Sequence, residues 1–273
     1  MSARPTHFLC LPLVNKASLP ALKTSLAKFL QDKAVQHVSN NGQSTGVSPP
    51  RSVREAPDSD IVPEKKDGSI YEAYLPARAI RPVETLHLTL GVMHLKDKAR
   101  IEAASDFLKG MDVKHIFSRV KPAMETSSAD TISSLEAPKS TKATSIKIYL
   151  KGLHSMQPSN KARVLYAEPF DPSDRVLAFC NAVRDRFIQA GYIMDEGREL
   201  KLHATIVNTI YAPKVRQGSK KRNLEFDARD LIDRWKNEIW AEIDLTKLAI
   251  CEMGAKEDVD GVIRYLEVAQ TEL

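Results

Sequence analysis

The chain has 273 residues, 42% of them hydrophobic, and a formal net charge of +5 at pH 7. This composition is ordinary for a soluble globular protein with a sizeable core, and the mild positive charge favours an anionic partner. No apolar run approaches the roughly 18 residues that a membrane span requires, which excludes an integral membrane protein built of helices.

The remaining bulk features concern compartment and assembly. Cys10, Cys180 and Cys251 are far apart and odd in number, which favours a reducing compartment over a disulfide framework. Residues 1–6 lack the features of a secretory signal. We therefore expect a monomer located in the cytoplasm, the nucleus or both, with no membrane partner.

Hydrophobic periodicity predicts a mixture of strands and helices. Strands are expected at 7–13, 85–93, 145–151, 163–170, 201–208, 244–253 and 262–270. Helices are expected from Ser18 to Leu30, at 97–108, from Ser173 or Asp174 to Phe187, and at 228–236. Flexible inserts, rich in polar and small residues, are expected at about 40–69, 118–144 and 213–223.

The order strand, helix, strand, helix, strand occurs once in each half of the chain. The similarity is one of element order, and it extends to residue identity in one motif only. We therefore expect a single domain over residues 1–273, made of two related lobes.

The motif shared by the halves is His-x-Thr within an apolar strand. It is centred on His87 and Thr89 in the first half and on His203 and Thr205 in the second. Side chains alternate along a strand, so each histidine and threonine share one face while the neighbouring aliphatic residues pack on the other. Two such strands, one per lobe, can face each other across a cleft.

This pair of motifs predicts acid–base chemistry on a phosphodiester. Histidine exchanges protons near neutral pH, so two imidazoles on opposite sides of a phosphorus atom can serve as base and acid. The threonine hydroxyls can donate to the non-bridging oxygens, where charge develops. A single histidine on a strand is more often structural, but two copies at the same place in the element order favour the functional interpretation.

At these residues the chain resembles the two-histidine phosphoesterases, and within them the branch of the A-kinase anchor protein nuclear-localisation-signal domain and the activating signal cointegrator phosphoesterase subunit. The matching segments are residues 7–13, 86–91 and 202–209. The resemblance implies a two-lobed α+β fold of the LigT-like type, with a pseudo-twofold axis and antiparallel or mixed sheets facing a central cleft. It also implies catalytic roles for His87 and His203, phosphate binding by Thr89 and Thr205, and RNA-type substrates: 2′,5′-linked oligonucleotides, 2′,3′-cyclic phosphates or RNA 3′ ends.

Other residues are weaker candidates. Arg81 can neutralise a phosphate, and Tyr211 or Tyr265 can stack on a base of RNA, an oligonucleotide or an AMP-like nucleotide. The basic run at 220–222 can contact an RNA backbone or be a solvated loop. No spacing of metal ligands is recognisable, so we expect no metal and no cofactor.

Two alternatives remain open beside the metal-independent phosphodiesterase. The first is a module that binds nucleotides or RNA with little turnover. The second is a subunit of an RNA-repair or transcription-coactivator complex.

Overall fold

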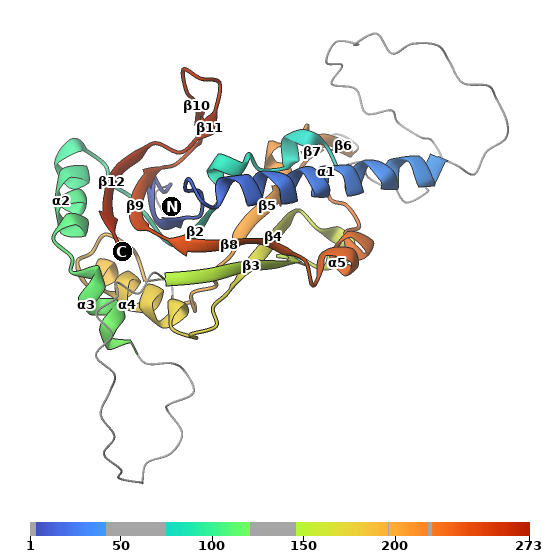
Figure 1. The fold of residues 1–273 in the computed structure, drawn as a ribbon. Coiled ribbons are helices and arrows are strands. Elements are labelled where there is room, and N and C mark those ends of the chain that lie inside the picture. The colour runs from blue at the N-terminus through green and yellow to red at the C-terminus, as the bar shows by residue number, and fades with distance from the viewer. Residues whose placement is uncertain (1–3, 42–74, 121–145, 196, 218–219) are drawn as a thin grey trace, which may run out of the picture.

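The computed structural model describes residues 4–41, 75–120, 146–195, 197–217 and 220–273 (Figure 1). The elements follow in this order: β1 (His7–Pro12), α1 (Leu19–Asn41), η1 (Ala77–Ala79), η2 (Val83–Thr85), β2 (His87–Met93), α2 (Lys98–Lys109), α3 (Val113–Arg119), β3 (Ile146–Ser155), η4 (Ser159–Lys161), β4 (Val164–Phe170), α4 (Val176–Gln189), β5 (Ala204–Asn208), η5 (Thr209–Tyr211), β6 (Val215–Gln217), β7 (Lys220–Arg222), α5 (Arg229–Trp235), β8 (Ile239–Leu245), β9 (Lys247–Glu252), β10 (Lys256–Glu257), β11 (Ile263–Arg264) and β12 (Glu267–Glu272). The elements labelled η are single turns of 3₁₀ helix.

Two four-stranded antiparallel sheets form the framework. The first sheet has the strand order β12-β9-β1-β2, and the second has the order β5-β4-β3-β8. The motif strands β2 and β5 are edge strands, and these two edges lie against each other. The α+β fold with antiparallel sheets is therefore confirmed.

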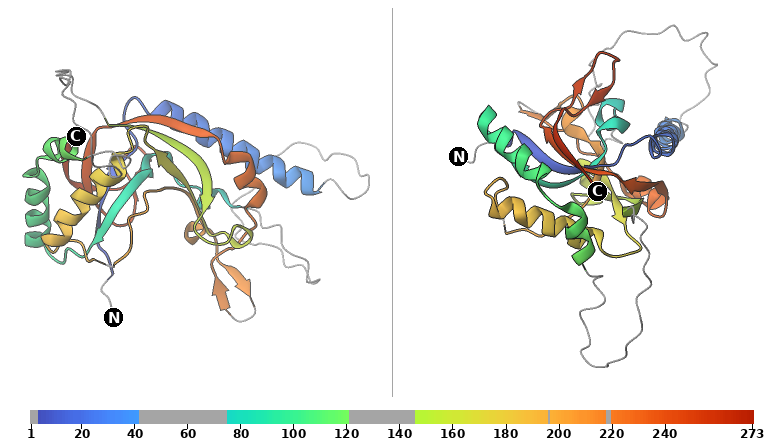
Figure 2. Two further views of the ribbon diagram at one scale, coloured as in Figure 1. Left: turned by 90° about the horizontal axis from the view of Figure 1, so that it is seen from below. Right: turned by 60° about the vertical axis from the view of Figure 1, so that its left-hand side comes forward.

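The helices cover the sheets from outside. α1 packs along β8, α5 against β3, α2 against β12, and α4 against both β2 and α3. Figure 2 shows α1 following the second sheet, while α2 and α4 gather at the other end of the molecule. None of the helices in the described ranges is long and apolar enough to cross a membrane.

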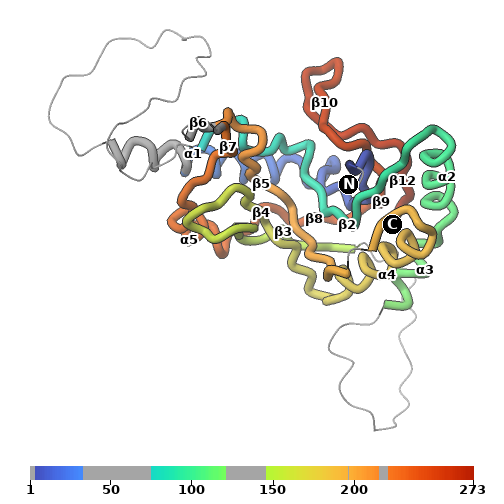
Figure 3. Tube along the Cα trace, turned by 180° about the vertical axis from the view of Figure 1, so that it is seen from behind, coloured from blue at the N-terminus to red at the C-terminus, as the bar shows by residue number. Residues whose placement is uncertain are grey.

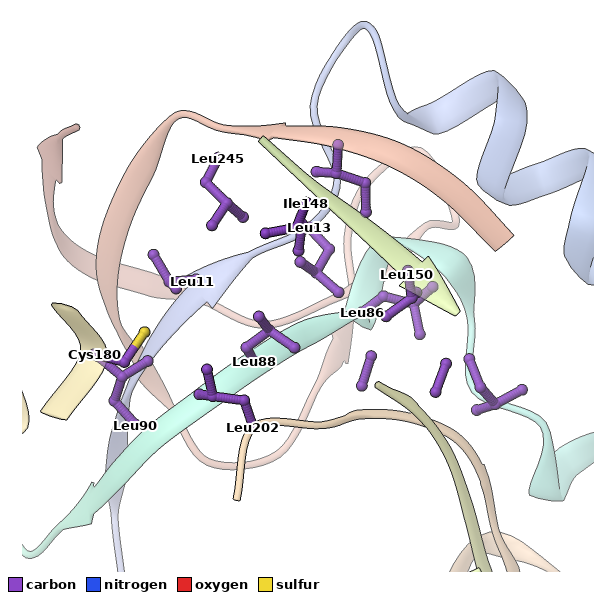
Figure 4. Close-up of a cluster of buried hydrophobic side chains, with 14 of the residues drawn as sticks. Leu11, Leu13, Leu86, Leu88, Leu90, Ile148, Leu150, Cys180, Leu202 and Leu245 are labelled. Atoms are coloured by element: carbon purple, nitrogen blue, oxygen red, sulfur yellow. The ribbon is translucent and has the colours of Figure 1, made fainter. Parts of the chain in front are cut away.

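The main hydrophobic core of the described residues is continuous through both sheets and the helices packed on them. It receives Leu11 and Leu13 from β1 and the turn after it, Leu88 from the first motif, Ile148 from β3 and Leu202 from the second motif (Figure 4). Burial of each large aliphatic side chain stabilises the fold by about 1.5–3 kcal/mol. The apolar face of both motifs is therefore fixed by a core that the two lobes share.

The sheets are interleaved along the chain, which contradicts the predicted assignment of strands to halves. The apolar run at 244–253 is two strands, β8 and β9, and the chain passes from the second sheet to the first at Thr246. β3 belongs to the second sheet, and β9 and β12 belong to the first (Figure 3). The order of elements along the chain does not say which strands are hydrogen-bonded to each other. The apolar character of the chain continues across Thr246, so hydrophobic periodicity did not indicate that the chain changes sheets there.

Several local predictions also differ. The inserts expected at 40–69 and 118–144 lie almost wholly outside the described residues. The insert expected at 213–223 contains the β6–β7 hairpin, and α3 was not predicted. The strand expected at 262–270 is divided between β11 and β12.

Candidate active site

The two motifs show the predicted alternation of side chains. Leu86, Leu88 and Leu90 are buried in the core, whereas His87 and Thr89 are partly exposed on the opposite face. The second copy repeats this pattern, although β5 begins one residue after His203 and not before it. A residue next to a strand end keeps the strand's alternation, so the histidine and threonine still share a face.

Both motif strands carry the same irregularity. The residue after each motif threonine has no cross-strand partner: it is Leu90 in β2 and Ile206 in β5. A β-bulge of this kind bends a strand and changes the direction of nearby side chains, and bulges are common beside functional sites. The two lobes are therefore similar in the backbone geometry of the motif strands as well as in the His-x-Thr sequence.

The two imidazole rings are held in the same way. Nδ1 of His87 lies 2.7 Å from the carbonyl oxygen of Thr85, and Nδ1 of His203 lies 2.8 Å from that of Lys201. A carbonyl only accepts, so each Nδ1 carries the proton and donates it to a residue two positions earlier. In the neutral ring Nε2 is then unprotonated, and it is free to accept a proton.

Backbone contacts bring the two motifs together. The backbone N–H of Arg81, in the segment leading into β2, donates to the carbonyl of Ile206 at 2.8 Å. Ile80 and Val207 form an isolated antiparallel bridge beside it. The segment that leads into β2 is therefore hydrogen-bonded directly to β5.

The electrostatics of His87 reflect this proximity. Burial lowers the pKa of His87 from 6.5 to about 4; the hydrogen bond to Thr85 opposes the shift, and the positive charges of Arg81 and His203 add to it. The charge of His203 thus acts on His87, so the two imidazoles lie within range of electrostatic interaction. His87 is the neutral form at pH 7.

The three weaker candidates cluster beside His87. Nη2 of Arg81 donates to the hydroxyl of Tyr265 at 3.3 Å, and its guanidinium lies over the ring of Tyr211, 4.1 Å from the centroid. Arg81 is only 7% exposed, and among the described residues no carboxylate forms an ion pair with it. A buried cation balanced by a phenol and an aromatic face suits a site that receives an anion.

Aromatic rings border both histidines, and two of them, Phe8 and Tyr166, were not singled out from the sequence. The His87 ring contacts Phe8 at a centroid distance of 4.8 Å and Tyr265, edge to face, at 5.2 Å. The His203 ring contacts Tyr166, edge to face, at 5.5 Å. Tyr166 lies opposite Thr205 in the β4–β5 register, so knowledge of the strand pairing would have identified it.

A cluster of polar side chains lies beside His203. Lys201 donates to the hydroxyl of Tyr166, and its Nζ is 3.8 Å from Oε1 of Glu168. The ring of His154 stacks on Tyr166, and its Nε2 lies 3.8 Å from the other oxygen of Glu168. The two histidines therefore have different neighbours: aromatic rings and the cation Arg81 lie beside His87, whereas Tyr166 with a cluster of charged and polar side chains lies beside His203.

The threonine hydroxyls remain available for a ligand. Within the described part of the chain, neither Thr89 nor Thr205 uses its side chain in a hydrogen bond with the protein. The same ranges hold no cluster of three or more His, Cys, Asp or Glu side chains that could ligate a metal.

The chain was compared with solved structures, curated proteins and protein families. Escherichia coli LigT in complex with 3′-AMP is 13% identical, with 98% of each chain covered and a TM-score of 0.43. A crystal structure described as a phosphoesterase is 12% identical over 99% of each chain, with a TM-score of 0.44. The protein TT0787 of Thermus thermophilus is 13% identical, covering 98% of this chain and 97% of its own, with a TM-score of 0.41.

No curated protein matches the chain. The sequence profile described as the AKAP7 2′5′ RNA ligase-like domain matches residues 5–270. The resemblance predicted from the first strand and the two His-x-Thr motifs is thereby confirmed, and the chain belongs to the AKAP7 2′5′ RNA ligase-like domain family.

Proposed function

We propose that this protein is a phosphodiesterase that acts on RNA-type phosphodiester bonds without a metal ion. The observation that carries the proposal is the matched arrangement of His87 and His203. Each Nδ1 is fixed by a backbone carbonyl, which leaves each Nε2 for proton transfer, and the charges of Arg81 and His203 both act on His87. Family membership supports phosphoesterase chemistry.

The first step is an in-line displacement within the substrate. Nε2 of neutral His87 removes the proton from a ribose hydroxyl next to the phosphate, and that oxygen attacks phosphorus. Protonated His203 gives its proton to the departing 5′ oxygen, so a 2′,3′-cyclic phosphate and a free 5′-hydroxyl form. Charge and atoms balance, because one proton is taken and one is given.

In a second step, water can open the cyclic phosphate with the roles reversed. His203, now neutral, removes a proton from the water, and His87, now protonated, returns its proton to the ribose oxygen. Thr89 and Thr205 donate to the non-bridging oxygens through both steps, and Arg81 offsets the charge that accumulates there.

A substrate with a ribose hydroxyl beside the phosphorus fits this chemistry, whereas DNA lacks the internal nucleophile. The related LigT structures are described in complex with 3′-AMP and with NADP⁺. We propose the same ligand class, nucleotides and short RNA, for this chain, with Tyr211 and Tyr265 as candidates for contacts with a base.

The test is a substrate panel assayed in excess EDTA. It contains 2′,5′-linked RNA, 3′,5′-linked RNA, a 2′,3′-cyclic phosphate and DNA of matched sequence. We expect turnover of at least one RNA-type substrate, none of DNA, and no effect of the chelator. Equal rates on RNA and DNA, or activity restored only by Mg²⁺ or Mn²⁺, would contradict the proposed mechanism.

A nucleotide-binding module would give a different result. It would bind a member of the panel in a calorimetric titration and release it unchanged, whether or not both histidines were present. We favour the enzyme because proton transfer requires two fixed imidazoles with free Nε2 atoms, whereas binding alone does not require them.

A further inference from the structure

A pocket of about 520 Å³ opens on the His87 side of the site. Its floor is formed by Phe8, Cys10 and Cys251 from the face of the first sheet that points away from the core, together with the ring of Tyr265. We call it the His87-side pocket. His87 lines it, whereas His203 does not, so the pocket extends the site in one direction only.

The pocket is sized and lined for a flat organic group. Ligand pockets commonly measure about 300–1,000 Å³, and this one combines an apolar floor with a largely polar and charged remainder. The ring of Tyr265 stands edge-on to both Phe8 and His87, at centroid distances of 4.9 Å and 5.2 Å. One nucleoside is of a suitable size for this space.

The rim of the pocket carries an excess of positive charge. Its cations are Lys16, Lys23, Lys247 and Arg264, and its carboxylates are Glu84 and Glu267. Three of the cations have acidic partners: Lys23 is 3.5 Å from Glu84, Lys247 is 2.6 Å from Glu267, and Arg264 is 2.7 Å from Asp258. Within the ranges that the structure describes, Lys16 has no ion-pair or hydrogen-bond partner for its side chain.

Lys16 is held close to the beginning of α1. The side chain of Asn15 accepts hydrogen bonds from the backbone of Ala17 and Ser18, at 2.9 Å each, which fixes the turn into the helix. Leu19 and Lys23 of the same helix also line the pocket. The positive end of the helix dipole therefore adds to the charge of Lys16.

We propose that the His87-side pocket binds the nucleotide that is joined to the reacting phosphate on the His87 side, and that Lys16 selects a nucleotide carrying a further phosphate group. The inference rests on the proposed function for the position of the reacting phosphate. The apolar floor holds the nucleoside, and the second phosphate reaches the rim at the start of α1. The expected preference is about tenfold, which corresponds to about 1.4 kcal/mol.

The test compares two dinucleotides, ApA and its 5′-phosphorylated form pApA, each with 2′,5′ and 3′,5′ linkages. Binding is measured by calorimetry to a His203→Ala variant, which leaves the pocket intact and prevents turnover during the titration. The same variant is then combined with Lys16→Glu, or with Lys96→Glu as a control that reverses the charge of an exposed lysine outside the pocket.

We expect pApA to bind about tenfold more tightly than ApA with at least one linkage. Lys16→Glu should abolish this preference and leave ApA binding unchanged, whereas Lys96→Glu should preserve it. Equal affinities for ApA and pApA, or an equal loss of both with Lys16→Glu, would overturn the proposal. Selective binding of pApA by a protein that cleaves neither dinucleotide would support the pocket and contradict the proposed chemistry.

Discussion

The guanidinium of Arg81 lies over the ring of Tyr211, although the two residues come from segments that flank different motif strands. Arg81 precedes β2, and Tyr211 follows β5. The contact therefore joins the two lobes at the edge of the site. Tyr211 is still 46% exposed, so part of its surface remains open to a ligand.

Replacement of Tyr211 should show what this contact contributes. A cation–π contact is worth about 0.5–2 kcal/mol, so Tyr211→Ala should raise KM by roughly 2- to 30-fold with a smaller effect on kcat. Tyr211→Phe keeps the aromatic face and should stay close to the wild type. A similar loss with both variants would instead assign the effect to the hydroxyl group.

The central prediction concerns the two histidines. His87→Ala and His203→Ala should each lower kcat by about 10²–10⁴-fold, equivalent to about 3–5 kcal/mol of transition-state stabilisation. The double variant should be little worse than either single variant, because base and acid act as one unit. Circular dichroism should show a retained fold, since neither ring belongs to the core cluster. A folded double variant with near-full activity would refute the mechanism.

The threonine hydroxyls should have a smaller effect. Thr89→Ala and Thr205→Ala each remove one hydrogen bond to phosphate, so kcat/KM should fall by about 10- to 100-fold, or roughly 1.5–3 kcal/mol. Thr89→Ser and Thr205→Ser keep the donor and serve as matched controls. If kcat/KM falls as much in the serine variants as in the alanine variants, the effect comes from the methyl group of threonine and not from its hydroxyl.

The pH dependence follows from the lowered pKa of His87. Since this pKa is about 4, His87 stays neutral at pH values well below the ordinary pKa of histidine. The acidic limb of the kcat/KM profile should therefore lie near pH 4. Arg81→Gln removes a charge that disfavours the imidazolium, so the pKa of His87 should rise and the limb should move to higher pH. An NMR titration of His87 checks the shift directly. An acidic limb that stays in place in Arg81→Gln would contradict this electrostatic role.

The motif chemistry was predictable from sequence because it depends on local periodicity. Alternation along a strand placed His87 and Thr89 on one face, and the aliphatic residues of the motif, such as Leu88, on the other. The same reasoning located most helices within a few residues. Each of these features is set by neighbours along the chain.

The features that were missed depend on contacts between distant segments. Tyr166 and Phe8 reach the histidines through strand pairing and side-chain direction. Arg81 was a candidate from the sequence, but its position depends on a backbone hydrogen bond to Ile206 that the sequence did not predict. Such contacts have no periodic signature. The turn at Thr246 was hidden for a related reason, since both strands beside it are apolar.

The crossing at Thr246 also has a consequence for folding. β1 occupies the centre of the first sheet, with β2 on one side and β9 on the other, and β9 begins at Lys247. When only the N-terminal half of the chain has left the ribosome, the sheet that carries His87 still lacks β9 and β12. Pairing of such distant segments is slow. We therefore expect the catalytic groups to assemble only after synthesis of the described chain is nearly complete, in one late cooperative event for both lobes.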